Sequence, residues 1–223
     1  MTTRSAKSRG VPRRSPTTVA STGRSLLPLV IGGVAIVAIA AILAVLLTSP
    51  ASTGAAEPAT EPLTVEGDAL PALPSSGTDP AIGATIPRLV GTGLERESVE
   101  IGPAGGAQAI VVVAHWCPHC QAEIPGLSAW LAEEGAPHGV RVVTLSTAID
   151  PARPNYPPSS WLAREEWTAP VLVDDSASSG LAALGLGGFP GFVFVNADGT
   201  VAARVTGAIG SEAFAEQVAA IAP

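Results

Sequence analysis

The chain has 223 residues, a formal net charge of −7 and only two cysteines. Residues 1–25 hold six of the twelve basic residues and no acid, so the remaining six basic residues stand against all nineteen acids. Binding to nucleic acid needs clustered Lys and Arg that contact phosphates, which excludes this function for so acidic a domain. The length is sufficient for one ordinary domain with appendages.

The first feature in chain order is an uncharged apolar run, residues 26–47, which follows the basic segment. As a helix this run would be roughly 33 Å long, close to the hydrocarbon thickness of a bilayer. We therefore expect residues 1–25 to be a basic cytoplasmic tail and residues 26–48 to be a single transmembrane anchor. The C-terminal portion of the chain would then lie outside the cytoplasm at the cell membrane, because basic flanks stay inside. The alternative is a cleaved secretory signal, whose apolar region is usually shorter; both interpretations export the domain.

Residues 49–81 are dominated by Ala, Pro, Ser, Thr and Glu and show no sustained apolar period. This composition predicts a disordered linker. The folded domain is expected over residues 82–223. Its two cysteines would then lie in a compartment where disulfides form and persist.

Apolar runs and periodic segments alternate within the expected domain. Strands are predicted at Gln108–Ala114, Val140–Leu145, Pro170–Val173, Gly191–Val195 and Thr200–Thr206, the last two joined by an Asp198-Gly199 turn. Helices are predicted from Cys117 onward, around Trp161 to Glu166, over Ser178–Leu184, and after a Ser211 cap, with Phe214, Val218 and Ile221 buried. This order indicates an α/β fold in which helices cover both faces of a mixed sheet.

The chemistry is concentrated where the first strand meets the first helix, in the run His115-Trp116-Cys117-Pro118-His119-Cys120. A thiol at a helix N-terminus faces unpaired N–H groups and the positive end of the helix dipole, which favour the nucleophilic thiolate. Cys120 follows one helical turn later, near enough to resolve a mixed disulfide at Cys117. Pro118 suits the first turn, and His119 can donate to the sulfur or stabilise it when protonated. His115 is interpreted as a strand-end or substrate-facing residue.

The segment from Trp116 to Cys120, with Pro125 after it, resembles the active-site helix of the thioredoxin superfamily. Residues 185–190, with an apolar strand and Asp198-Gly199 after them, are similar to the cis-proline loop and hairpin of that superfamily. The similarity is greatest to the TlpA-like branch of membrane-anchored thiol–disulfide oxidoreductases, whose characteristic insert corresponds to residues 150–173. The resemblance spans about residues 82–222. It implies a thioredoxin-like fold, a mixed central sheet flanked by helices. The apolar run at residues 26–47 predicts that one N-terminal transmembrane helix precedes this fold.

The resemblance also implies roles for individual residues. Cys117 is expected to be the attacking, more exposed thiol and Cys120 the resolving thiol, the two forming a redox-active disulfide. Pro190 is expected to be cis, which would put the backbone of Phe189 beside the sulfurs.

Other site residues are expected to support the cysteines. Trp116 is predicted to pack at the rim of the site. Glu123 matches a glutamate of the TlpA-like branch, and the resemblance implies that it helps to move protons at the buried thiol. Two positions depart from the superfamily: Val111 stands where many thioredoxins have an acid, and Phe189 is larger than the usual residue before the cis-proline.

Other interpretations of the two cysteines have less support. A structural disulfide that closes so short a loop would contribute little stability. Haem attachment needs a histidine directly after the second cysteine, where this chain has Gln121. A zinc site would need all its ligands from residues 115–120, with no second ligand pair elsewhere. We therefore expect neither a metal nor another cofactor.

We expect a protein-disulfide oxidoreductase that acts on thiols or disulfides of exported proteins, with a membrane electron donor or acceptor as its redox partner. The similarity to TlpA-like reductases favours disulfide reduction. Cys-Pro-His-Cys is also the tetrad of strongly oxidising, disulfide-introducing proteins, so the oxidase direction remains open. The alternative of another class is a non-catalytic thioredoxin-like module that binds a partner or a metal.

Overall fold

The computed structural model describes residues 62–223. The predicted cytoplasmic tail, the predicted transmembrane anchor and the first part of the predicted linker lie outside the described residues. Within residues 62–223, none of the helices is both long and apolar enough to cross a bilayer.

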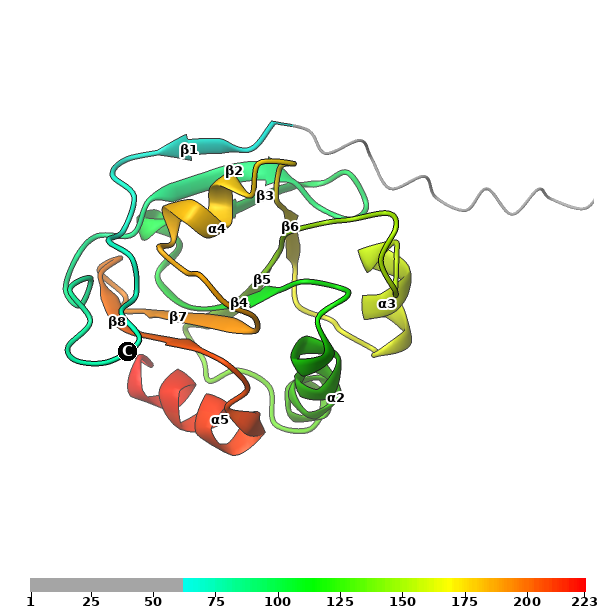
Figure 1. The fold of residues 1–223 in the computed structure, drawn as a ribbon. Coiled ribbons are helices and arrows are strands. Elements are labelled where there is room, and N and C mark those ends of the chain that lie inside the picture. Colours follow the sequence, from blue (N-terminus) through cyan, green and yellow to red (C-terminus); the bar gives the residue numbers. More distant parts are fainter. Residues whose placement is uncertain (1–61) are drawn as a thin grey trace, which may run out of the picture. The chain divides into compact units, whose positions relative to one another are not determined.

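A five-stranded mixed sheet forms the centre of the domain (Figure 1). Its strands, in spatial order, are β6 (Val171–Val173), β5 (Val140–Ser146), β4 (Ala107–Val113), β7 (Gly191–Val195) and β8 (Val201–Thr206). The first three run parallel, whereas β7 is antiparallel to β4 and β8 is antiparallel to β7. All five predicted strands and the mixed sheet are confirmed. Asp198 and Gly199 form the turn between β7 and β8, where Gly199 has a φ of 83° and Asp198 accepts the N–H of Thr200.

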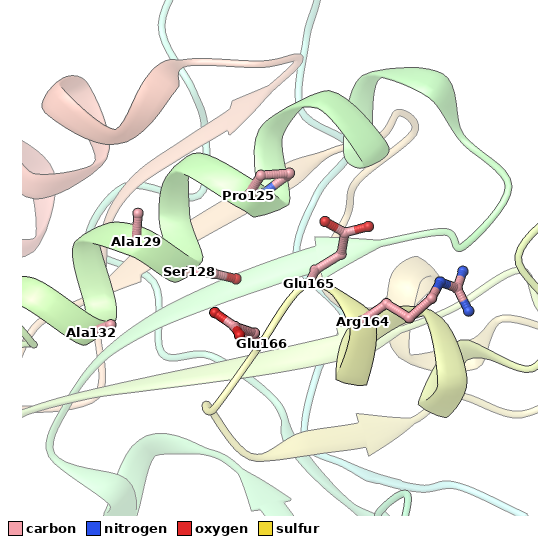
Figure 2. A pocket seen from close by; sticks show the side chains of 7 residues that line it. All are labelled: Pro125, Ser128, Ala129, Ala132, Arg164, Glu165 and Glu166. Carbon is pink, nitrogen blue, oxygen red and sulfur yellow. The ribbon is translucent and has the colours of Figure 1, made fainter.

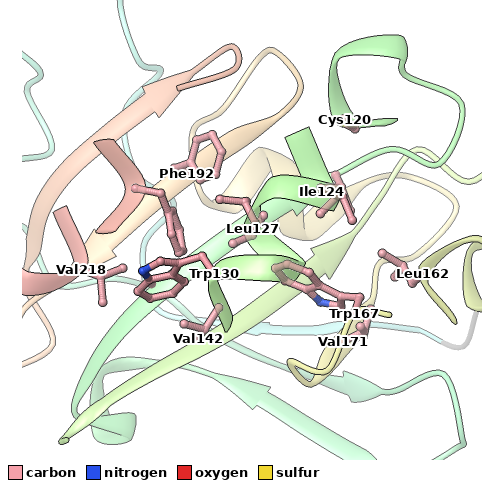
Figure 3. Close-up of a cluster of buried hydrophobic side chains, with 14 of the residues drawn as sticks. Cys120, Ile124, Leu127, Trp130, Val142, Leu162, Trp167, Val171, Phe192 and Val218 are labelled. Carbon is pink, nitrogen blue, oxygen red and sulfur yellow. The ribbon is translucent and has the colours of Figure 1, made fainter. Parts of the chain in front are cut away.

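Strand β4 is buried on both faces, which explains its continuous apolar run. On one face, Val111 belongs to an apolar cluster covered by helices α2 (Pro118–Glu133) and α5 (Gly210–Ala220) (Figures 1 and 3). On the other face, Ile110 belongs to a second cluster covered by the short helix α4 (Ser179–Ala183) and an N-terminal sheet. Two apolar cores therefore hold the strand that leads into the cysteine segment.

Helix α3 (Pro158–Arg164) adds Trp161 and Leu162 to the cluster under α2. On α2 itself, Cys120, Ile124 and Leu127 are buried at the predicted helical spacing. The buried face of the cysteine-bearing helix is thus the one that the periodicity predicts.

A second sheet of three antiparallel strands is absent from the prediction. Its members are β1 (Thr64–Glu66), β2 (Arg88–Thr92) and β3 (Ser98–Ile101), and a 3-10 turn at Pro103–Gly105 follows them. The strands are short and carry charged side chains, so their apolar period is weak. Arg88 on β2 pairs with Glu66 at 2.9 Å and with Glu100 at 2.8 Å, contacts across strands that only the fold brings together.

The predicted linker, residues 49–81, is wrong for residues 62–81, because these residues pack on the domain. Leu63 and Leu70 are buried, and the N–H of Leu70 donates to the carbonyl of Ala183 at 2.8 Å. Asp79 accepts a hydrogen bond from Nε of Arg204 at 2.9 Å. These anchoring residues are irregularly spaced among Pro, Ser and Ala, so they produce no periodic signal. The folded domain therefore begins before residue 82.

The predicted Ser211 cap of the last helix is also wrong. Helix α5 begins at Gly210, and its N-cap residue, Ile209, provides no side-chain hydrogen bond. Glu123 from α2 accepts the N–H groups of Ile209 and Gly210 instead, at 3.1 and 2.8 Å. A distant carboxylate thus takes the place of the local hydroxyl.

Candidate active site

The two cysteines lie where β4 ends and α2 begins. Cys117 is the N-cap residue of α2, with extended backbone angles (φ −75°, ψ 120°), and Pro118 is the first helical residue. The carbonyl of Cys117 accepts the N–H of Gln121 at 3.0 Å, which opens the helical hydrogen-bond pattern. The Cys117 sulfur is therefore carried at the positive end of the helix dipole, where negative charge is favoured.

The two thiols differ in their surroundings. Cys117 is 6% exposed and Cys120 is fully buried, next to Ile124 in the apolar cluster (Figure 3). Both cysteines are free thiols. Burial, and after it the proximity of Cys117 and Glu123, raises the pKa of the Cys120 thiol well above its ordinary value. Cys117 is thus the more accessible sulfur, and Cys120 is a neutral thiol behind it.

The loop before β7 approaches the accessible sulfur. The Phe189–Pro190 peptide bond is cis, as predicted. The Cys117 thiol donates to the carbonyl oxygen of Phe189, with 3.7 Å between sulfur and oxygen. The Phe189 ring contacts Trp116 edge to face, with 6.0 Å between ring centroids. The backbone of Phe189 therefore lies beside the sulfur, and its side chain forms one wall of the site.

Glu123 lies one turn after Cys120 on α2 and is only 7% exposed. Its Oε1 accepts the two hydrogen bonds from the start of α5. The carboxylate is close enough to Cys120 to contribute to the raised pKa of that thiol. Glu123 therefore stands beside the buried thiol and also has a structural role that the sequence did not indicate.

His115 is a strand-end residue that holds a loop, and it does not face a substrate, because its side chain is fully buried. Its Nδ1 lies 2.7 Å from the carbonyl oxygen of Pro154, and its Nε2 accepts the N–H of Asp150 at 3.2 Å. The neighbouring Trp116 donates from Nε1 to the carbonyl of Ala148 at 2.8 Å. Sequence reasoning missed this attachment because each partner lies more than thirty positions away along the chain.

The remaining predicted site residues lie around the cysteines. Pro118 and His119 are exposed in the first turn of α2. No hydrogen bond joins His119 to either sulfur in the described part of the chain. Val111 is buried in β4, so no carboxylate stands at that position of the strand. Across residues 62–223, no group of three or more His, Cys, Asp or Glu side chains is arranged to hold a metal ion.

A pocket beside α2 does not include either cysteine (Figure 2). It lies between α2 and the end of α3, with a volume of about 250 Å³, and its lining is Pro125, Ser128, Ala129, Ala132, Arg164, Glu165 and Glu166. The hydroxyl of Ser128 is buried there, and the described residues give it no hydrogen-bond partner. Neither cysteine lines this pocket; the Cys117 sulfur contacts Phe189, whose ring contacts Trp116.

No curated protein matches the sequence significantly. A protein-family model described as Redoxin matches residues 67–219. Among solved structures, the chain is similar to a putative thiol:disulfide interchange protein DsbE from Chlorobium tepidum, with 19% identity and a TM-score of 0.53 over 63% of this chain and 96% of that one.

A second thiol:disulfide interchange protein of the thioredoxin family, also from Chlorobium tepidum, shows 19% identity and a TM-score of 0.51 over 66% of this chain and 99% of that one. A secreted disulfide oxidoreductase from Mycobacterium tuberculosis is 26% identical, with a TM-score of 0.48 over 59% of this chain and 94% of that one. The two Chlorobium structures confirm the predicted thioredoxin-like α/β fold.

Proposed function

Because this chain belongs to the Redoxin family and has the fold of thioredoxin-like thiol–disulfide oxidoreductases, we propose that Cys117 and Cys120 are its redox pair. The reaction is dithiol–disulfide exchange with protein clients. The observation that supports it best is the position of the more accessible sulfur, 3.7 Å from the Phe189 carbonyl oxygen, with the fully buried Cys120 one turn behind it.

In the reducing direction, the Cys117 thiolate attacks one sulfur of a client disulfide. A bond forms between Cys117 and that sulfur, the client's S–S bond breaks, and the other client sulfur leaves as a thiolate that takes up a proton. Cys120 then loses its proton and attacks the Cys117 sulfur. The Cys117–Cys120 disulfide forms, the second client sulfur is released, and two electrons have passed from the protein to the client.

The second step requires removal of a proton from Cys120, whose pKa is raised by burial. Glu123 is the carboxylate that acts on this thiol electrostatically, and we assign it the role of proton acceptor. One of its oxygens is already occupied by the N–H groups of Ile209 and Gly210, so the other oxygen would accept the proton. Val111 cannot take this part, since its side chain has no titratable group.

We assign the reducing direction because of the resemblance to TlpA-like reductases, with the reverse, disulfide-introducing reaction as the alternative. The two directions differ in reduction potential: about −270 mV is typical of thioredoxin and about −120 mV of a strongly oxidising disulfide donor. A potential near the first value, measured by equilibration with glutathione and dithiothreitol, supports reduction, and one near the second overturns it. His119→Pro should lower the potential if His119 stabilises the reduced thiolate.

The clients are exported proteins, and the domain is held outside the cytoplasm by a transmembrane anchor at residues 26–48, which also brings it to a membrane electron donor or acceptor. This proposal rests on the basic and apolar segments of the sequence. In intact cells, a membrane-impermeant maleimide should label Cys117 of the full-length protein. Labelling only after lysis would contradict the assigned topology.

The exchange reaction is tested with the full-length protein in detergent and insulin as a disulfide substrate. Catalysed reduction should disappear in Cys117→Ser. Cys120→Ser should instead accumulate a covalent mixed disulfide with the client, visible on non-reducing gels, because the attacking sulfur remains and the resolving sulfur is gone. Equal adduct formation in both variants, or turnover without Cys117, would refute the assigned roles of the two cysteines. Absence of turnover in the wild-type protein would instead favour a non-catalytic binding module.

A further inference from the structure

The loop between β5 and α3 contacts the two residues that precede Cys117 and is fastened at two places. Trp116 holds it near its start, where the indole N–H donates to the carbonyl of Ala148. His115 holds it further along, where Nε2 accepts the N–H of Asp150 and Nδ1 donates to the carbonyl of Pro154. Both anchors come directly before Cys117 in the chain. The loop therefore keeps a fixed position relative to the reactive sulfur.

Arg153 lies between these attachment points, and its side chain is exposed. Its guanidinium stands 4.3 Å from the centroid of the Trp116 ring, within the range in which a cation is attracted to an aromatic face. The same ring contacts Phe189, whose carbonyl accepts the thiol of Cys117. A continuous series of contacts thus leads from the guanidinium to the sulfur.

Arg153 is one of few basic residues in a domain that is rich in acids. Residues 62–223 contain seventeen acids, six arginines and no lysine. Four of the other arginines are engaged: Arg88 and Arg204 in ion pairs, and Arg141 and Arg164 in hydrogen bonds to oxygen atoms.

Arg153 makes no ion pair within the described residues. The acid nearest to it in the sequence, Asp150, uses its carboxylate to accept the N–H of Ala152 at 2.9 Å. A positive group therefore remains available on the Trp116 ring, which contacts the residue that accepts the Cys117 thiol, in an otherwise acidic domain.

We propose that Arg153 selects client segments that carry Asp or Glu next to the reacting cysteine, while Trp116 and Phe189 contact an adjacent apolar side chain. This inference rests on the proposed exchange function and deepens it by naming the class of client. Complementary charge mainly steers association, so the effect belongs in the second-order rate constant and weakens with salt. The rest of the domain is negatively charged and repels acidic clients as a whole. The preference for Asp or Glu therefore applies only to the client residue that lies next to Arg153.

The test uses three peptides with an internal disulfide, identical except for Glu, Gln or Lys beside the attacked cysteine. The reduced full-length protein should react about fivefold faster with the Glu peptide than with the Lys peptide at low salt, as expected for an exposed ion pair of up to about 1 kcal/mol. Arg153→Gln should bring this ratio close to one, Arg153→Lys should keep part of it, and 0.5 M NaCl should reduce it. Arg96→Gln removes the same charge from the β2–β3 turn and should keep the full ratio.

The outcomes separate this inference from the proposed function. If the wild-type protein reduces all three peptides at one rate, or if Arg153→Gln keeps the preference for Glu, Arg153 does not select clients, while the exchange function stands. If no peptide is reduced although Cys117 is free, the exchange function fails, and the inference fails with it. If Arg96→Gln lowers the ratio as much as Arg153→Gln does, the preference comes from the net charge of the domain and the assignment to Arg153 is overturned.

Discussion

One carboxylate oxygen of Glu123 lies 2.8 Å from the backbone nitrogen of Gly210, so the helix that carries both cysteines also caps the last helix of the domain. The same oxygen accepts the N–H of Ile209 at 3.1 Å. The first N–H groups of a helix have no partner within the helix, and negative charge is favoured beside them. A single buried side chain thus links α2, the Cys120 thiol and α5.

Glu123→Ala should destabilise the reduced protein by about 1–2 kcal/mol, the usual effect of losing a helix cap. Glu123→Gln should lower the free energy of unfolding by about half as much, since an amide oxygen still accepts both N–H groups but brings no charge to the start of the helix. Urea unfolding midpoints measure the difference. Glu133→Gln, an exposed glutamate near the end of the same helix, is the matched control and should leave the midpoint unchanged.

Glu123→Gln also separates the cap from the proposed proton acceptor, because it keeps the first role and removes the second. We expect the mixed disulfide at Cys117 to form at the wild-type rate and to be resolved about a hundredfold or more slowly, in the range of lost general-base catalysis. Rapid quenching with acid and mass spectrometry would follow both steps. Resolution at the wild-type rate would leave Glu123 with its structural role alone.

Alkylation should distinguish the two thiols. In Cys120→Ser, iodoacetamide should modify Cys117 of the folded protein readily at pH 7. In Cys117→Ser, Cys120 should react about a hundredfold or more slowly, because it is fully buried and its raised pKa leaves little thiolate. Mass spectrometry of timed samples gives both rates, and addition of urea should make them equal. Equal rates in the folded variants would contradict the assignment of Cys117 as the attacking sulfur.

The stability of the reduced protein should fall at alkaline pH on account of Cys120. The pKa of this thiol is raised in the folded state, so its contribution is intact below the unfolded pKa of about 8.5. Above that pH the unfolded chain releases the proton and the folded protein keeps it, which favours unfolding by up to about 1.4 kcal/mol per pH unit. Cys120→Ala lacks this titration but leaves a cavity. This variant should therefore be less stable than the wild type at pH 7. The difference between the two free energies of unfolding should narrow between pH 8.5 and 10.5.

The parts of the fold that could be predicted are those whose residues form a pattern within a short stretch of the sequence. The continuous β-branched run of β4 and the helical spacing of Cys120, Ile124 and Leu127 identify the central sheet and the cysteine-bearing helix, because both patterns reflect burial of neighbouring residues. The N-terminal sheet could not be recognised in this way. Its strands are short, and Arg88 is paired with acids 22 and 12 positions away.

The residues of the candidate site also fall into those that a local signal predicts and those that only the fold brings together. Cys117, Cys120 and Pro190 belong to short motifs that the chain carries in full, so the positions of these residues could be predicted. The attachments of His115 to Pro154 and of Glu123 to Gly210 join residues 39 and 87 positions apart. Nothing in the local sequence specifies such partners, since any buried acceptor can be satisfied by whichever donor the fold brings to it.

The ion pair between Asp79 and Arg204 should be what holds residues 62–81 to the domain. The Arg204 side chain is fully buried and also donates to the carbonyl of Leu184, so Asp79→Asn would leave an uncompensated charge in the interior and destabilise the protein by about 3–5 kcal/mol. Asp68→Asn, an exposed acid of the same segment, should have little effect.

The hydrogen bond to Arg204 lowers the pKa of Asp79, so the contribution of the pair to stability is present above the unfolded pKa of about 3.9 and is lost as pH falls through the folded pKa. Urea midpoints of wild type and Asp79→Asn should therefore differ at pH 7 and converge in acid. A midpoint unchanged at pH 7 would mean that the buried apolar side chains of the segment, Leu63 and Leu70, hold it without this pair.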